Sequence, residues 1–218
     1  MIKTANTGSF KRLPIMGILR GIEVDSVAPV IEAVAGAGLE TIEVTMNTAR
    51  ASAVIRKAVK AAGKRLAVGA GTVLTVRSLE EALNAGATFI VMPAFIEDVV
   101  KRCVKLNIPS FPGALTPQEI YNAWRGGASM VKVFPSGFFG PSYFREIKGP
   151  FDDIRLLACG GVTSANLAEY FSAGADAVAF GSSVFRKELL LKKEYGKIAE
   201  GVRSYISAYR AMERAAGR

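Results

Sequence analysis

Two ionisable side chains, Lys132 and Glu43, lie inside segments of the sequence that are otherwise apolar or β-branched. Lys132 belongs to the run SMVKVF and Glu43 to the run TIEVT. An ammonium group in such a segment loses hydration, so we expect its pKa to fall, and a carboxylate there is costly unless it is paired or used. A partly neutral lysine amine can attack a ketone to form a Schiff base, and a nearby carboxylate can then move protons. The two residues therefore predict imine chemistry on a keto compound.

The same two residues also have an interpretation that involves no chemistry. A structural salt bridge between Glu43 and Lys132 would account for both charges. Alternatively, the strand parity of Lys132 could point its side chain outward among helices. The local sequence leaves these alternatives open.

The composition excludes several classes of site. The chain has 218 residues, 50% of them hydrophobic, and it contains no histidine. Ser-His-Asp and Cys-His arrangements, histidine metal clusters and imidazole acid–base catalysis are therefore excluded. The two cysteines, Cys103 and Cys159, are far apart in the chain and form no CxxC redox or zinc pattern. Any catalysis must depend on Lys, Asp, Glu, Tyr, Cys or Arg.

The charge and hydropathy patterns limit the possible partners. A formal charge of +9 is compatible with nucleic acid, an anionic membrane or an anionic substrate. No basic run alternates with aromatic residues, so we do not expect a nucleic-acid partner. The longest uncharged stretch, residues 82–96, is shorter than the roughly 20 apolar residues that a membrane-spanning helix needs. The N-terminal residues 1–19 lack the pattern of a secretory signal. We therefore expect a cytoplasmic protein without membrane contact.

A periodic pattern predicts the elements that position Lys132 and Glu43. Short apolar runs with strand character alternate with helix-like stretches, and each such stretch ends in a residue that tolerates a left-handed cap. The runs are 14–19, 41–44, 65–71, 88–92, 108–111, 129–134, 153–158 and 176–180. The cap residues are Gly38, Gly63, Gly86, Asn107, Gly127, Gly149 and Gly174. The predicted N-caps of the helices are Asp25, Thr75, Thr116 and Thr163.

Eight strand–helix units of this kind predict a compact α/β fold, a (β/α)8 TIM barrel. An open doubly wound sheet is the alternative, but eight units would give it two long exposed edges. We expect one domain over residues 1–218, with residues 1–13 as an arm or short helix. Residues 186–218 are predicted to form a C-terminal helical segment. Its apolar face would comprise Ile198, Val202, Tyr205, Ile206 and Tyr209.

Chemistry in such a barrel is located where the strands end. Two glycine turns follow the last two predicted strands, CGGVT (residues 159–163) and FGSS (residues 180–183). We expect both turns to present free backbone N–H groups at the start of a helix, where such barrels commonly bind phosphate. Each motif alone is also typical of a simple tight turn. Together they predict a phosphorylated substrate.

The chain resembles the class I 2-keto-3-deoxy-6-phosphogluconate/4-hydroxy-2-oxoglutarate aldolases. The resemblance extends from about residue 14 to residue 185, in collinear order, through EVTMNT, VGAGTVL, FIVMP, PGALTPQEI, VKVFP, GGVT and FGSS. It implies a compact (β/α)8 barrel, commonly a homotrimer, that needs neither a metal nor a cofactor. The implied activity splits a phosphorylated keto-acid into pyruvate and glyceraldehyde 3-phosphate.

The resemblance also implies a role for each matching residue. Lys132 would form the Schiff base with pyruvate, and Glu43 would move protons. The residues implied to surround the substrate are Thr72 and Pro93 at the pyruvate end, Phe134 beside the imine, and Gly160, Gly161 and Ser182 at the phosphate.

Two positions depart from the gluconate branch of this family. Asn47 stands where that branch generally has an arginine that holds the pyruvate carboxylate, and Cys159 stands where it has a threonine. These departures, with the segments ILRGI and FFGPSYF, are more similar to the 2-keto-3-deoxy-6-phosphogalactonate aldolases, in which an arginine at the position of Arg20 can take the carboxylate. Cys159 could equally be a small apolar filler.

Three functions therefore remain open on the sequence alone. The first is cleavage of a 2-keto-3-deoxy-6-phospho-sugar acid, of either the gluconate or the galactonate configuration. The second is cleavage of the unphosphorylated 4-hydroxy-2-oxoglutarate. The third is a basic binding protein that retains the barrel without the chemistry.

Overall fold

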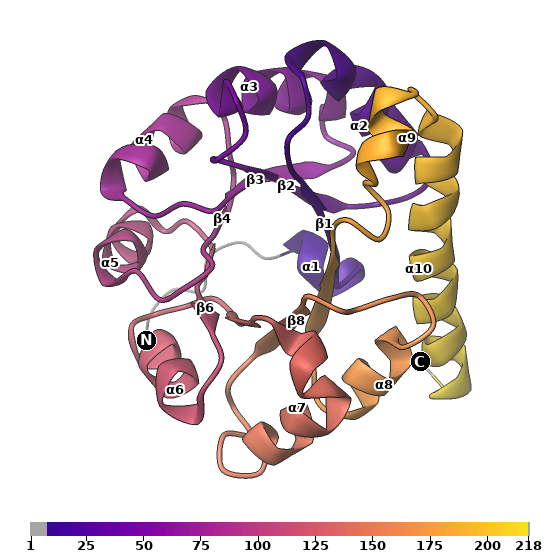
Figure 1. Ribbon diagram of the computed structural model, residues 1–218. Coiled ribbons are helices and arrows are strands. Elements are labelled where there is room, and N and C mark those ends of the chain that lie inside the picture. Colours follow the sequence, from indigo (N-terminus) through magenta and orange to yellow (C-terminus); the bar gives the residue numbers. More distant parts are fainter. Residues whose placement is uncertain (1–7, 218) are drawn as a thin grey trace.

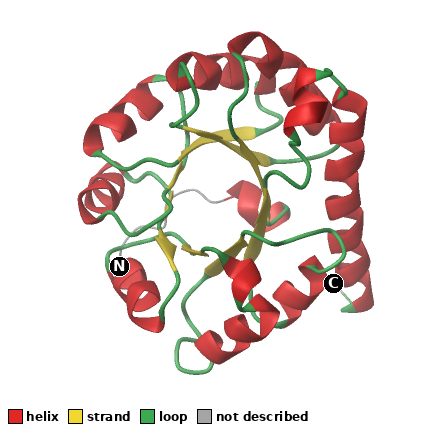
Figure 2. Ribbon diagram, viewed as in Figure 1, coloured by secondary structure: helices red, strands yellow, loops and turns green. Residues whose placement is uncertain are grey.

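Parallel strands form a ring that is enclosed by helices, as seen end-on in Figures 1 and 2. The computed structural model describes residues 8–217. The strands are β1 Ile15–Leu19, β2 Thr41–Thr45, β3 Ala67–Gly71, β4 Ile90–Val91, β5 Ser110–Phe111, β6 Gly113–Ala114, β7 Val131–Val133, β8 Leu156–Cys159 and β9 Ala177–Phe180. Every pairing among these described strands is parallel, in the order β5-β4-β3-β2-β1-β9-β8-β7-β6.

The ring closes at Pro112, which divides the fifth predicted strand into β5 and β6. β5 pairs with β4, and β6 pairs with β7. The amide of Ser129 donates to the carbonyl of Ser110 (2.9 Å), and the amide of Lys132 donates to the carbonyl of Pro112 (2.8 Å). Because Pro112 has no N–H, it can only accept in this ladder, which accounts for the break. The predicted (β/α)8 barrel is confirmed, and the open doubly wound sheet is wrong.

Helices cover the outer face of the ring (Figure 1). They are α2 Val27–Gly36, α3 Ala51–Ala62, α4 Val76–Asn84, α5 Glu97–Leu106, α6 Pro117–Arg125, α7 Gly140–Lys148, α8 Leu167–Ser172, α9 Lys187–Leu191 and α10 Tyr195–Ala215, with 3-10 turns η1 Val24–Ser26 and η2 Ser136–Phe138. α1 Gly8–Arg12 instead appears within the ring when the barrel is viewed end-on (Figure 1). The strands are apolar on both sides because both faces of the sheet are covered, and the helices turn their apolar sides toward the sheet for the same reason. Most of the core therefore lies between the barrel and its helices.

The predicted N-caps are confirmed at two positions of four. Thr75 and Thr116 each accept a bond from the backbone of the third helical residue and form capping boxes. Asp25 lies within η1 instead. Thr163 exchanges reciprocal bonds with Asn166, so a separate turn comes before α8 and moves its start to Leu167.

Six of the seven predicted left-handed helix ends have positive φ. Gly149 is the exception, with φ −54° and a right-handed conformation. The prediction of left-handed geometry at Gly149 is therefore wrong, although α7 does end there.

A second, smaller core fills the barrel interior. Its members are Phe10, Met16, Phe89, Val91, Phe111, Met130, Leu157, Cys159, Ala177 and Ala179. Phe10 comes from α1, and its ring centroid lies 5.6 Å from that of Phe89 and 4.9 Å from that of Phe111. Because α1 immediately precedes β1, this aromatic cluster closes the end of the barrel at which the strands begin. The predicted N-terminal helix is thus present over Gly8–Arg12, and residues 1–7 of the predicted arm lie outside the described residues.

The predicted C-terminal helical segment consists of α9 and α10. All five residues of the predicted apolar face, from Ile198 to Tyr209, are buried. α10 packs beside α2 and α8 and runs along one side of the barrel (Figure 1).

Candidate functional site

Lys132 and Glu43 meet inside the barrel, from β7 and β2. Lys132 is 7% exposed and Glu43 is 1% exposed. The two charges act on one another, and both act on the thiol of Cys159, which belongs to the interior core. Lys132 therefore points into the barrel, and the alternative in which it points outward among the helices is wrong.

The carboxyl group of Glu43 is buried without a complete set of partners. Its Oε2 atom has no hydrogen-bond partner among the described residues. Within the same part of the chain, no ion pair of 4 Å or less joins Glu43 to Lys132. Burial raises the pKa of Glu43, and the positive charges of Lys132 and Arg20 oppose that rise without cancelling it. A carboxyl group in this state is suited to hold and release a proton, whereas a structural salt bridge would need direct contact.

Gly71 on the neighbouring strand makes the room for this carboxyl group. A Cβ atom at position 71 would lie 2.4 Å from Glu43 Oε1, closer than real Cβ contacts occur. β2 and β3 pair in the register Thr45↔Gly71. Gly71 was not among the predicted site residues, because nothing within the segment VGAGT shows which side chain of another strand it faces.

Cys159 belongs to the interior core, and the positive charge of Lys132 acts on its thiol. It is 2% exposed, and burial raises the pKa of the thiol despite the nearby ammonium. The Cys159 amide donates to Ser136 Oγ (2.9 Å), which itself donates to the carbonyl of Val133 (2.8 Å). Ser136 therefore holds the ends of β7 and β8 together next to Lys132. Sequence analysis missed it, although its position directly after VKVFP was a possible signal.

The aromatic ring of Phe134 covers the amine. Lys132 Nζ lies 5.2 Å from the ring centroid, and Phe134 itself is 40% exposed. A cation over the face of a ring is attracted electrostatically, so the ring both shields and orients the ammonium.

Arg20 directly follows β1 and is exposed. Its charge acts on both Glu43 and Cys159, which places it near the interior groups. The amide of Gly21 donates to Thr48 Oγ1 (3.0 Å), and this bond joins the loop after β1 to the loop after β2. Asn47 is exposed in the latter loop, and no hydrogen bond joins it to Glu43 or Lys132 within the described part of the chain.

Thr72 and Pro93 lie at the ends of β3 and β4. Thr72 is half-buried with φ 57°, a conformation that is strained for a β-branched residue. Pro93 is half-buried, and its carbonyl would lie 2.1 Å from a Cβ atom at Gly113. The backbone conformation at both positions is thus constrained by the surrounding structure, at the ends of the strands that enclose the interior groups.

The two glycine turns follow β8 and β9. Gly160 and Gly161 have φ of 85° and 84°, and a Cβ at position 161 would lie 2.7 Å from Gly137 Cα. The amides of Gly161, Ser182 and Ser183 have no hydrogen-bond partner among residues 8–217. Unpaired N–H groups gathered in turns can bind an anion.

The expectation that these turns open a helix directly is wrong. α8 begins only at Leu167 and α9 only at Lys187. The turn at Thr163–Asn166 occupies the space before α8, and the amides of Val184 and Phe185 fold back onto the carbonyl of Gly181. The unpaired amides therefore belong to turns, and the macrodipole of a helix contributes little to them.

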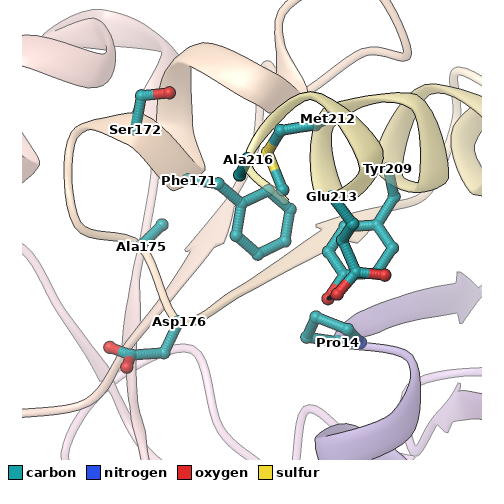
Figure 3. A pocket seen from close by; sticks show the side chains of 9 residues that line it. All are labelled: Pro14, Phe171, Ser172, Ala175, Asp176, Tyr209, Met212, Glu213 and Ala216. Atoms are coloured by element: carbon teal, nitrogen blue, oxygen red, sulfur yellow. Dashed lines mark hydrogen bonds between the residues drawn. The ribbon is translucent and has the colours of Figure 1, made fainter. Parts of the chain in front are cut away.

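A separate cavity of about 360 Å³ lies at the opposite end of the barrel, between α8 and α10 (Figure 3). Its lining includes Pro14 and Asp176, which precede β1 and β9. None of the candidate residues reaches this cavity.

The described residues contain no group of three or more His, Cys, Asp or Glu side chains arranged to hold a metal ion. None of their helices is both long enough and apolar enough to cross a membrane.

The chain is similar to known proteins over most of its length. The family model described as KDPG and KHG aldolase matches residues 7–200. The chain is 33% identical over 198 residues to a 2-dehydro-3-deoxy-6-phosphogalactonate aldolase of Escherichia coli (strain K12). The aligned region covers 90% of this chain and 97% of that protein. It is 35% identical over 161 residues to a 2-dehydro-3-deoxy-phosphogluconate aldolase of Pseudomonas aeruginosa, covering 73% and 71% of the two chains.

Solved structures agree with these relatives. One described as "Native KDPGal structure" superposes with a TM-score of 0.87 at 32% identity and covers 93% of this chain and 97% of its own. A KDPG aldolase from Legionella pneumophila, with pyruvate captured as a covalent carbinolamine intermediate, has a TM-score of 0.84 at 25% identity, covering 90% and 96%.

The buried carboxyl group predicts a pH dependence of stability. Because the pKa of Glu43 is raised in the folded chain, the folded state binds this proton more tightly than the unfolded chain does. The resulting stabilisation is complete below the ordinary glutamate pKa and is lost as the pH rises through the raised pKa. Glu43→Gln should therefore become progressively more stable relative to wild type as the pH rises above the ordinary glutamate pKa of 4.5, as measured by urea unfolding at each pH.

Glu32→Gln is the matched control. The hydrogen bond from Arg65 lowers the pKa of Glu32, so its stabilisation is present above the ordinary pKa and is lost as the pH falls. The stability of the Glu32 variant relative to wild type should therefore stay constant above the ordinary pKa of 4.5, and a slope of the opposite sign should appear only below it. A stability difference between Glu43→Gln and wild type that does not change with pH would contradict the raised pKa of Glu43.

Proposed function

Because the chain belongs to the KDPG and KHG aldolase family, and is therefore a lyase, we propose that it reversibly splits a 2-keto-3-deoxy-6-phospho-sugar acid into pyruvate and glyceraldehyde 3-phosphate. The observation that carries the proposal is the buried amine of Lys132 beside the incompletely paired carboxyl group of Glu43. The substrate has the gluconate or the galactonate configuration, and relatives of both kinds are similar to this chain. Membership of an aldolase family argues against the alternative of a non-catalytic binding protein.

In the proposed reaction, the amine of Lys132 attacks the C2 ketone, and loss of water leaves an iminium. A base takes the proton of the C4 hydroxyl, the C3–C4 bond breaks, and its electron pair moves to the iminium nitrogen. The aldehyde half leaves, and an enamine of pyruvate remains on Lys132. Protonation of its methylene carbon and hydrolysis of the imine release pyruvate and regenerate the amine.

Glu43 is proposed to move the protons in these steps. Burial raises its pKa, so the carboxyl group takes up a proton more readily than an exposed glutamate does, as a group that both accepts and returns protons requires. Its unpaired Oε2 gives the reacting atoms a free acceptor inside the barrel.

The ends of the substrate are assigned by charge. We propose that Arg20 binds the carboxylate and that the turns with Gly160, Gly161 and Ser182 bind the phosphate, because these are the cation and the unpaired amides at the mouth. Thr72, Pro93 and Phe134 would line the pyruvate end, with Asn47 and Cys159 as the positions that distinguish this chain from the gluconate branch.

A cytoplasmic location and a homotrimer are proposed with this function on the same family resemblance.

The Schiff base is tested by trapping. Borohydride added together with pyruvate should attach one pyruvate-derived adduct to the peptide that contains Lys132 and should abolish activity, because reduction makes the imine irreversible. Mass spectrometry of the digested protein locates the adduct, and chelators should leave turnover unchanged.

Lys148→Ala serves as the control, since this lysine bonds to Asp176, which directly precedes β9 at the opposite end of the barrel. The variant should still be trapped by pyruvate. Labelling at another lysine, or loss of activity with EDTA that a divalent metal restores, would contradict the proposed mechanism.

Removal of Arg20 tests the carboxylate contact. A partly desolvated carboxylate needs a charge-assisted partner, and Asn47 offers only a neutral amide. Arg20→Ala should lose about 2–4 kcal/mol of transition-state stabilisation, or roughly 30- to 1000-fold in kcat/KM. Steady-state kinetics of cleavage provides the measurement.

Asn47→Ala is the comparison and should lose much less. Asn47→Arg in the Arg20→Ala background should recover part of the loss by supplying a cation from the neighbouring loop. Near-wild-type kcat/KM in Arg20→Ala would show that another group holds the carboxylate.

A further inference from the structure

A buried tyrosine of the C-terminal helix connects the two glycine turns by hydrogen bonds. Tyr205 lies in the middle of α10 and is 3% exposed. Its hydroxyl donates to the carbonyl of Val162 (2.8 Å), immediately after the Gly160-Gly161 pair. The same hydroxyl lies 2.9 Å from Ser183 Oγ, immediately after Ser182.

The direction of the second bond follows from the first. A phenol has one O–H, and that of Tyr205 is used by Val162. Ser183 must therefore be the donor and Tyr205 the acceptor. The resulting chain of two hydrogen bonds connects the turn after β8 to the turn after β9 through a single oxygen atom.

The approach of α10 to these turns is set by packing. A Cβ atom at Gly201, one helical turn before Tyr205, would lie 3.1 Å from Val184 Cγ1, so glycine lets the helix come close to the second turn. The ring of Tyr205 lies against that of Phe180 at the end of β9, with 4.5 Å between centroids. These contacts hold the Tyr205 hydroxyl in a fixed position next to both turns.

We propose that Tyr205 is a positioning residue for the phosphate end of the substrate, which it never touches. By fixing Val162 and Ser183, its hydroxyl sets the spacing of the unpaired amides of Gly161 and Ser182. The inference rests on the proposed function, because it assumes that these turns bind phosphate. Donors that are already in place bind an anion without first having to be ordered.

Tyr205→Phe removes the oxygen atom and keeps the ring. For the phosphorylated substrate, kcat/KM should fall about tenfold, mainly through a higher KM, as expected for losing one ordering hydrogen-bond bridge. For the same sugar acid without its phosphate, kcat/KM should stay within about twofold of wild type. The quantity measured is the ratio of the two kcat/KM values, in wild type and variant.

Two further variants complete the design. Tyr209→Phe is the matched control, because its hydroxyl, one turn later on the same helix, donates to Glu213 on α10 itself. It should leave the ratio unchanged. Ser183→Ala should lower the ratio as Tyr205→Phe does, and the double variant should lose no more than the larger single loss, because both changes break one bridge. Ser183→Ala also replaces Tyr205→Phe as the test if the tyrosine variant does not fold.

The outcomes separate this inference from the proposed function. If wild type shows no preference for the phosphorylated substrate, the phosphate assignment fails and the role of Tyr205 fails with it. If wild type shows the preference and Tyr205→Phe keeps it, only the positioning role is wrong. An equal loss on both substrates would mean that the bridge serves stability alone, which also overturns the inference.

Discussion

The burial of a carboxyl group near an amine is the constraint on which the rest of the barrel depends. Glu43 is buried with one oxygen unpaired, and this state costs free energy because the oxygen has lost its hydration without gaining a hydrogen-bond partner. The fold tolerates it because Gly71 leaves space for the carboxyl group and because Lys132 and Arg20 supply positive charge, while burial raises its pKa. The aromatic cluster around Phe10 closes the end of the interior opposite to the mouth.

The mouth is held together by hydroxyl groups that connect successive strand ends. Thr48 accepts from Gly21 between the first two loops, Ser136 joins β7 to β8, and Tyr205 joins the turns after β8 and β9. Each bridge fixes a loop that carries a candidate group. Rigid placement of this kind allows short loops to present charges and amides at defined positions, which binding and catalysis both require.

Much of this arrangement could be predicted from the sequence. Charged residues in apolar runs identified Lys132 and Glu43, and the regular spacing of caps and strands predicted the barrel. The features that escaped prediction depend on contacts between distant segments. Gly71 matters because of a side chain on β2, and Tyr205 because a helix that follows the last strand reaches back under two turns. The delayed start of α8 was missed because Thr163 and Asn166 bond to each other in a turn rather than at a helix end.

The central claim is that Glu43 moves protons at the carbon next to the imine. Exchange of the pyruvate methyl protons for deuterium, followed by NMR in wild type and Glu43→Gln, tests it most directly, because exchange requires the enamine but no aldehyde. Exchange in the variant should be slower by about a hundredfold or more, with the fold retained and borohydride trapping at Lys132 still detectable. Exchange at the wild-type rate would contradict the claim and leave Glu43 as a structural neighbour of Lys132.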